Sequence, residues 1–168
     1  KVDNPNITKA EQRLNSAKKT QTSAKKSYNN SVKAKKQSAK KVTSAKSNLQ
    51  SVLKKSKVSS TRKSQIQKDL KSGHVIITKG LKGSTLKAAQ QYNSAVKSNN
   101  QNANKVKLTR KNLTTANKNV KTQQTNLTNA KKNLTATQRA ILSTQKSKKT
   151  FVAQNKLLDY QTSASKQE

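Results

Sequence analysis

The side chains that could carry acid–base chemistry are few and scattered along the 168 residues. The five acidic residues are Asp3, Glu11, Asp69, Asp159 and Glu168. General acid–base catalysis needs two titratable groups that are held together and have shifted pKa values, and this spacing does not favour such a pair. We therefore expect a protein that is not an enzyme.

Metal and cofactor sites are equally poorly supported by the sequence. His74 is the only histidine, Asp69 is the only acid near it, and the chain has no cysteine to act as a thiolate ligand. The segment from Gly80 to Gly83 superficially resembles a phosphate-binding loop, but it lacks the required glycine spacing and the Lys-Ser/Thr pair. We expect no catalytic residue, no metal and no cofactor.

Positive charge is the strongest chemical signal. Lys and Arg number 38 against 5 Asp and Glu, which gives a formal net charge of +33 at pH 7. A dense field of one sign attracts polyanions and releases their counterions, so we expect diffuse polyanion binding with a steep salt dependence. The lysines predicted to take part are Lys18, Lys19, Lys25, Lys26, Lys35, Lys36, Lys40, Lys41, Lys131 and Lys132.

The type of cation and the scarcity of aromatic residues narrow the choice of polyanion. Proteins that read a nucleic acid sequence rely on Arg forks and aromatic stacking, but here the arginines are only Arg13, Arg62, Arg110 and Arg139, and aromatic residues make up 2%. Specific DNA reading is therefore disfavoured. Lysine supplies point charges that suit loose phosphate contacts, as on the glycerol- or ribitol-phosphate chains of a Gram-positive wall.

The hydrophobic pattern indicates which elements position these lysines. Hydrophobic residues make up 29% of the chain, too few for a thick core. Apolar and small residues nevertheless recur every seven positions from Ile7 and Ala10, and again from Tyr92 and Ala88, with Lys35 as the charged exception. Such a repeat of a and d positions is typical of a coiled coil.

We predict an all-α fold, namely a long antiparallel two-helix coiled-coil hairpin that forms one elongated domain, residues 1–168. The first helix is expected over residues 8–72 and the second over residues 85–160. The connection at residues 73–84, which contains all three glycines, forms a small irregular tip. The apolar residues that follow residue 150 form a C-terminal overhang or a short third helix.

Local signals give the predicted ends and register of the helices. Thr8 and Glu11 have the spacing of a capping box at the start of the first helix, and Gly73 suits its end. In an antiparallel pair, the residue numbers of facing a and d positions add to a constant. A loop centred on this tip gives a sum of 158. This register pairs Ala45 with Leu113. The seam is polar around residues 56–59, and we interpret this stretch as a hinge.

Two groups of large apolar residues lie outside the regular seam, at the tip and in the overhang. Exposed apolar patches on so polar a chain need a partner, which for the overhang could be a second copy of the chain. No apolar run is long enough to cross a membrane. The candidates for partner contact are Val75, Ile76, Ile77, Phe151, Leu157, Leu158 and Tyr160.

The repeated Asn-Leu-Thr motif at Asn112, Asn126 and Asn133, the Ser-Ala-Lys blocks, the absence of cysteine and the extreme basicity carry a family resemblance. In these features the chain resembles surface proteins of lactobacilli, including S-layer-associated proteins, and the coiled-coil stalks of the surface-exclusion family. The resemblance covers most of the chain. It implies an exported, wall-bound protein with an interaction role, and it carries over no functional residue.

These observations lead to one functional expectation and two alternatives. We expect an exported cell-surface protein of a Gram-positive bacterium that is held on teichoic acid of the cell wall by charge and presents a helical stalk for adhesion or surface assembly. An S-layer protein or a host surface protein would be its further partner. The alternatives are a basic protein that compacts nucleic acid without sequence specificity, and a coiled-coil spacer of a larger surface enzyme.

Overall fold

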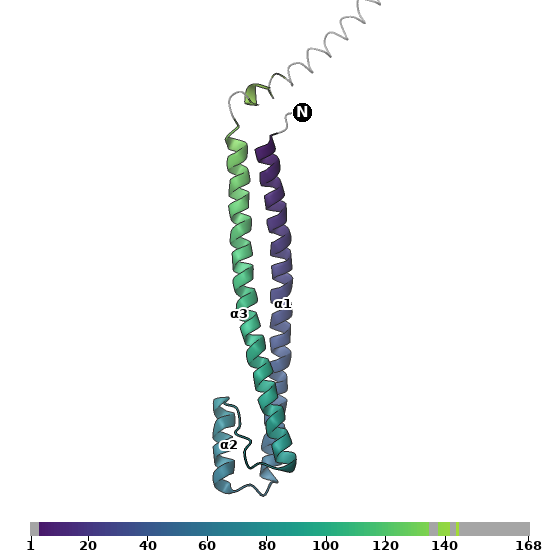
Figure 1. Cartoon of the computed structure of the whole chain (residues 1–168), viewed down its shortest axis with the longest axis vertical. Helices are drawn as coiled ribbons and strands as arrows, with labels where there is room; N and C mark the ends of the chain where they lie inside the picture. Colours follow the sequence, from purple (N-terminus) through teal and green to yellow (C-terminus); the bar gives the residue numbers. More distant parts are fainter. Residues whose placement is uncertain (1–3, 135–137, 142–143, 145–168) are drawn as a thin grey trace, which may run out of the picture. The chain divides into compact units, whose positions relative to one another are not determined.

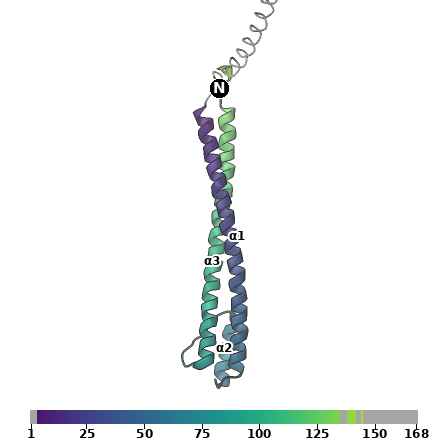
Figure 2. The ribbon, with the colours of Figure 1, turned by 90° about the vertical axis from the view of Figure 1, so that its right-hand side faces the viewer.

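The computed structural model describes residues 4–134, 138–141 and 144 (Figure 1). Its long elements are α1 over Pro5–Lys54, α2 over Ser60–Ser72 and α3 over Gly83–Lys132. α1 and α3 run in opposite directions and pack against each other (Figure 1, Figure 2), and the described residues contain no strand. The prediction of an all-α helical hairpin is confirmed.

The chain divides into two compact units. One is formed by residues 20–117 and the other by the two chain ends, residues 1–19 and 118–168. In the second unit Ala10 and Leu14 of α1 are buried together with Leu127 of α3. α1 and α3 run through both units, and the expectation of a single domain stays a prediction.

The larger buried cluster belongs to the 20–117 unit, and we call it the head cluster. It joins the C-terminal end of α1, both apolar residues of α2, the connection after α2 and the first turns of α3. Its members are Leu49, Leu53, Ile66, Leu70, Ile76, Leu81, Ala88, Ala89, Tyr92 and Val96.

α1 begins earlier than predicted and uses a different cap. The backbone N–H groups of Asn6 and Ile7 donate to Asn4 Oδ1 at 3.0 and 3.4 Å, so Asn4 satisfies the free donors of the first turn. Pro5 takes the first helical position, where its missing N–H costs no hydrogen bond and its fixed φ suits the helix. The predicted capping box of Thr8 and Glu11 therefore lies inside the helix and does not start it.

The prediction of one helix over residues 8–72 is wrong, because the helix stops at Lys54. At this end Ser56 donates to the carbonyl of Leu53 through both its N–H, at 3.1 Å, and its hydroxyl, at 2.7 Å. Ser59 then caps α2 by accepting a backbone N–H of the first turn at 3.3 Å. Serines compete for backbone hydrogen bonds and favour helix ends over helix interiors, so the stretch predicted as a hinge is where the chain turns.

α2 ends at the predicted glycine. Gly73 has a φ of 73°, the left-handed conformation that favours glycine, and its N–H donates to the carbonyl of Leu70 at 3.3 Å. The predicted connection over residues 73–84 is two residues shorter, because α3 begins at Gly83. α2 and this connection fold back beside α1 and α3 (Figure 1), which brings Ile66 and Leu70 into the head cluster.

The heptad seam predicted from the sequence is confirmed. In α1 every a and d position from Ile7 and Ala10 onward is buried or half-buried, except Lys35, which is exposed. In α3 every predicted a and d position from Ala88 to Ala130 is buried or half-buried, whereas Ile141, the last predicted a position, lies beyond the end of α3 and is 43% exposed. The repeat therefore identifies the contacting face of both long helices.

The register of the two long helices differs from the prediction. The Ser38 hydroxyl donates to Asn99 Oδ1 at 2.8 Å, and these two residue numbers add to 137 instead of 158. The difference, 158 − 137 = 21 residues, is three whole heptads, so the seam keeps its phase while every pairing changes. The cause is α2, since the turn between the long helices starts at Lys54. Ala45 consequently packs against the head cluster and does not face Leu113.

The second long helix is also shorter than predicted. α3 ends at Lys132, whereas the sequence predicted a helix over residues 85–160. Asn133 forms a turn whose N–H donates to the carbonyl of Asn129 at 2.8 Å, and residues 138–141 are helical again. The predicted overhang, including Phe151, lies outside the described residues.

Cysteine pairs test the register directly, because the natural chain has no cysteine. The hydroxyl oxygens of Ser31 and Thr109 are 2.7 Å apart, so the variant Ser31→Cys/Thr109→Cys should form a disulfide within one chain. In the matched pair Ala45→Cys/Leu113→Cys the thiols are offset by about 30 Å along the helices and should stay reduced. Non-reducing electrophoresis and mass spectrometry at low protein concentration measure both. A disulfide in the second pair alone would show that the helices pair in the predicted register, in which facing residue numbers add to 158.

Candidate functional site

All ten lysines that were predicted to contact a polyanion are exposed. They do not converge on one site, because eight lie along α1 and the other two, Lys131 and Lys132, lie in the last turn of α3. The arrangement suits many weak contacts along a polymer rather than one tight contact with a small ligand.

Sequence reasoning missed the regularity of these lysines. The f position of the heptad lies farthest from the seam, and a lysine occupies five of the eight f positions in α1 and four of the eight in α3. Seven residues of helix span about 10.5 Å, so neighbouring lysines of a row lie about 10.5 or 21 Å apart along the axis. We call these two rows of exposed lysines the lysine ladders. They consist of Lys19, Lys26, Lys33, Lys40 and Lys54 in α1, and of Lys97, Lys111, Lys118 and Lys132 in α3. The heptad count alone contained this signal.

Almost no acid balances this charge within the 20–117 unit. Residues 20–117 contain 23 Lys and Arg and a single acid, Asp69, which lies half-buried on α2. The parts of α1 and α3 in this unit therefore contain no acidic residue at all. Counter-charge for the ladder lysines of this unit must come from salt ions or from a bound polyanion.

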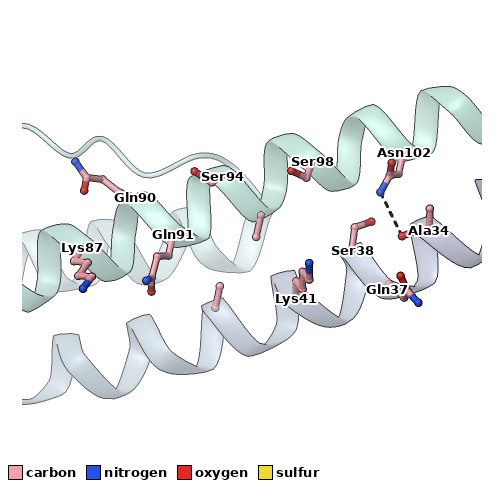
Figure 3. A pocket seen from close by; sticks show the side chains of 12 residues that line it. Ala34, Gln37, Ser38, Lys41, Lys87, Gln90, Gln91, Ser94, Ser98 and Asn102 are labelled. Atoms are coloured by element: carbon pink, nitrogen blue, oxygen red, sulfur yellow. Dashed lines mark hydrogen bonds between the residues drawn. The ribbon is translucent and has the colours of Figure 1, made fainter.

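A groove of about 650 Å³ lies between α1 and α3 in the same unit (Figure 3). Its lining includes small residues of both helices, among them Ala34 and Ala45 of α1 and Ala95 of α3. Figure 3 shows Lys41 of α1 and Gln91 of α3 reaching into the space between the helices. The other amide, hydroxyl and ammonium groups that line it belong to Gln37, Ser38, Lys87, Gln90, Ser94, Ser98 and Asn102.

Two of these groups already have partners inside the protein. Asn102 Nδ2 donates to the carbonyl of Ala34 at 3.3 Å, and the Ser38 hydroxyl donates to Asn99 Oδ1. The remaining amides and hydroxyls can both donate and accept hydrogen bonds, and the lysines add positive charge. A groove of this kind can hold an extended chain that carries hydroxyl groups and negative charge.

The predicted contact residues of the tip have different environments. Val75 and Ile77 are 57% and 68% exposed, whereas Ile76 is 3% exposed and belongs to the head cluster. The alternation follows from the extended backbone, in which successive side chains point to opposite sides. Ile76 is therefore a core residue and not a contact for a partner. The other predicted contacts, Phe151, Leu157, Leu158 and Tyr160, lie outside the described residues.

Polar side chains fix this extended segment from two sides. Asn93 of α3 accepts the Ile76 N–H at 2.7 Å and donates to the Ile76 carbonyl at 2.8 Å. Arg62 of α2 donates to the carbonyls of Ile77 and Lys79. Val75 and Ile77 are thus held outward on a backbone whose neighbouring polar groups have partners.

Within the part of the chain that the structure describes, no three His, Asp or Glu side chains gather as a metal site would require. The described helices also include none with the length and hydrophobicity to span a membrane. Comparison with known protein families, with characterised proteins and with solved structures finds no significant match to this chain.

Replacing Asn93 should destabilise the head. The variant Asn93→Ala removes both hydrogen bonds to Ile76 and leaves a part-buried N–H and carbonyl without them. An unmade hydrogen bond in such a place costs about 1–3 kcal/mol, so the free energy of unfolding should fall by about 2 kcal/mol. Urea titration followed by circular dichroism measures it. The exposed Asn100→Ala serves as the control and should stay within about 0.5 kcal/mol of the wild type.

Stability should also fall at high pH because of Tyr92. Burial, and secondarily the Asp69 carboxylate, raise the pKa of the Tyr92 hydroxyl above its ordinary value of 10.0. The unfolded chain then releases this proton at a lower pH than the folded chain, so stability is complete below pH 10 and is lost as the pH rises through the folded-state pKa. Above pH 10 the unfolding free energy of the wild type should therefore fall relative to that of Tyr92→Phe. Parallel curves for the two proteins would contradict this.

Proposed function

We propose that this chain is an exported, non-enzymatic protein that binds the anionic polymers of a Gram-positive cell wall by charge and presents its helical hairpin for adhesion or surface assembly. The observation that carries the proposal is the pair of lysine ladders, most of whose lysines lie in the 20–117 unit, where Asp69 is the one acid. Such a surface gains free energy when a polyanion replaces many bound salt ions.

The chemistry of the ladders favours a flexible chain of phosphates. Lysine contacts phosphate as a point charge without the fixed fork of arginine, so it does not select one geometry of the partner. Charges repeated along a helix suit a polymer that can adjust its phosphates to them. Teichoic acid is a polymer of this class, and its polyol units offer hydroxyls to the amides that line the groove, such as Gln91 and Gln37.

The assignment to the cell surface rests on the resemblance to lactobacillus surface proteins and on the helical hairpin. A hairpin held to the wall by its lysines would leave Val75 and Ile77 as apolar contacts for a further partner. An S-layer protein or a host surface protein is the partner that this function calls for.

Wall binding should be strong at low salt and should disappear at high salt. We expect the purified protein to sediment with Gram-positive cell walls in low-salt buffer and to be released as salt competes for the phosphates. Walls from which teichoic acid has been stripped should retain far less protein. Equal retention on stripped and intact walls would refute the assignment to teichoic acid, and a clear preference for duplex DNA over teichoic acid would favour a nucleic-acid-binding role.

The same assay can isolate the contribution of the α1 ladder. The variant Lys26→Gln/Lys33→Gln/Lys40→Gln removes three charges from one row of exposed positions. Each lost phosphate contact lowers the slope of log affinity against log salt by about 0.7 for a single-stranded polyanion, so the slope should fall by about 2. Exposed serines of the same helix changed to glutamine, Ser27→Gln/Ser44→Gln/Ser47→Gln, are the matched control and should keep the slope.

A further inference from the structure

A second hollow, of about 440 Å³, lies between α1 and α2 and is lined by three lysines and two glutamines. Lys46 and Gln50 come from α1, one helical turn apart, and both are half-buried. The other three residues, Gln67, Lys68 and Lys71, lie within a little more than one turn of α2 and are exposed. No acidic side chain lines it.

The fold brings these lysines together, and the sequence alone did not. On the predicted single helix over residues 8–72, Lys46 and Lys68 would lie about 33 Å apart along the axis. The turn after Lys54 folds α2 back beside α1 (Figure 1). Lys68 and Lys71 of α2 and Lys46 of α1 therefore line one hollow.

Three like charges in one hollow repel each other, and the protein offers little to offset this. The nearest acid in the sequence, Asp69, follows Lys68 in α2, accepts a hydrogen bond from Gln65 at 3.4 Å and does not line the hollow. The position of Lys71 in the last turn of α2 is favourable for a cation, but it offsets only one of the three charges. An anion bound in the hollow would therefore lower the repulsion between the three ammonium groups.

We propose that this hollow, the three-lysine site formed by Lys46, Gln50, Gln67, Lys68 and Lys71, binds a phosphate group. Three ammonium groups and two amide N–H donors match an anion with several oxygens and about two negative charges, whereas a carboxylate offers two oxygens and one charge. Two sources supply this chemistry, namely free inorganic phosphate and a phosphate of a polymer that lies across the head. The site does not depend on the proposed wall binding, because any phosphate of suitable size can fill it.

Thermal unfolding in inorganic phosphate tests the site. We expect the melting temperature of the wild-type chain to rise in phosphate relative to sodium chloride at equal ionic strength, because a ligand that binds only the folded state stabilises it. The variant Lys46→Gln/Lys68→Gln/Lys71→Gln should lose this rise. In chloride at low ionic strength the same variant should melt above the wild type, since it lacks the repulsion, whereas lysines with a merely structural role would give a lower melting temperature.

The ladder variant Lys26→Gln/Lys33→Gln/Lys40→Gln is the matched control, because it removes the same charge from positions about 10.5 Å apart that share no hollow. It should keep the phosphate-dependent rise. An equal loss in both variants would overturn the proposal, since it would show only a general charge effect. If the site variant does not fold, the side-chain amide signals of Gln50 and Gln67 in the wild-type NMR spectrum give the answer, and their failure to shift with phosphate overturns it.

A short glycerol-phosphate oligomer distinguishes the two sources of phosphate. If both the oligomer and inorganic phosphate raise the melting temperature through the three lysines, the site accepts a phosphodiester of a polymer, and if inorganic phosphate alone does so, it accepts free phosphate. Wall binding that survives in the site variant would support the lysine ladders as the wall-binding surface. A phosphate site without any wall binding would refute the proposed function while leaving this site intact.

Discussion

The alignment of α1 against α3 depends on the packing of the head cluster. A seam built from a seven-residue repeat looks the same after a shift of seven residues, so the seam by itself permits several registers. The head adds contacts that the repeat of α1 and α3 does not contain, because α2 and the connection after it bring Ile66, Leu70 and Ile76 against Leu49, Leu53 and Tyr92. Each of these large buried side chains contributes about 1.5–3 kcal/mol, which a shifted register would forfeit.

Away from the head, hydrogen bonds between polar side chains also join α1 and α3 across the seam. Ser31 and Ser38 are buried in the seam and bond to Thr109 and Asn99 at 2.7 and 2.8 Å. Such bonds add little net stability, but leaving a buried hydroxyl without a partner costs about 1–3 kcal/mol. They therefore select the correct pairing more than they strengthen it, and they leave room for the groove beside Ser38.

The part of the fold that could be predicted from the sequence is the part that repeats. The heptad count identified the buried face of both long helices, and Gly73 was identified as a helix end, because each of these depends on local geometry. The end of α1 at Lys54 could not be predicted from the repeat, because Ile66 and Leu70 continue the heptad phase beyond it. The tertiary gain from folding these two residues onto the head, together with the hydrogen bonds of Ser56 and Ser59, favours the break after Lys54.

The candidate sites divide in the same way. The exposure of the predicted lysines other than Lys35 follows from their heptad positions, so sequence reasoning could identify them. Ile76 was misjudged as a contact residue because its burial depends on the two hydrogen bonds from Asn93, which is seventeen positions away in the chain. The three-lysine site likewise depends on the return of α2 beside α1.

The hydrogen-bonded pairs along the seam of the 20–117 unit also have an order of formation built into them. Ser38 and Asn99 are 61 positions apart, Ser31 and Thr109 are 78 apart, and Gln21 and Asn117 are 96 apart. Closing a longer loop costs more chain entropy, but each pair becomes short-range once the one nearer the turn has formed. The least loop entropy is therefore lost when α1 and α3 pair first at the head and then progressively away from it. During synthesis α1 leaves the ribosome before α3, so α1 cannot form this pairing until α3 has also emerged.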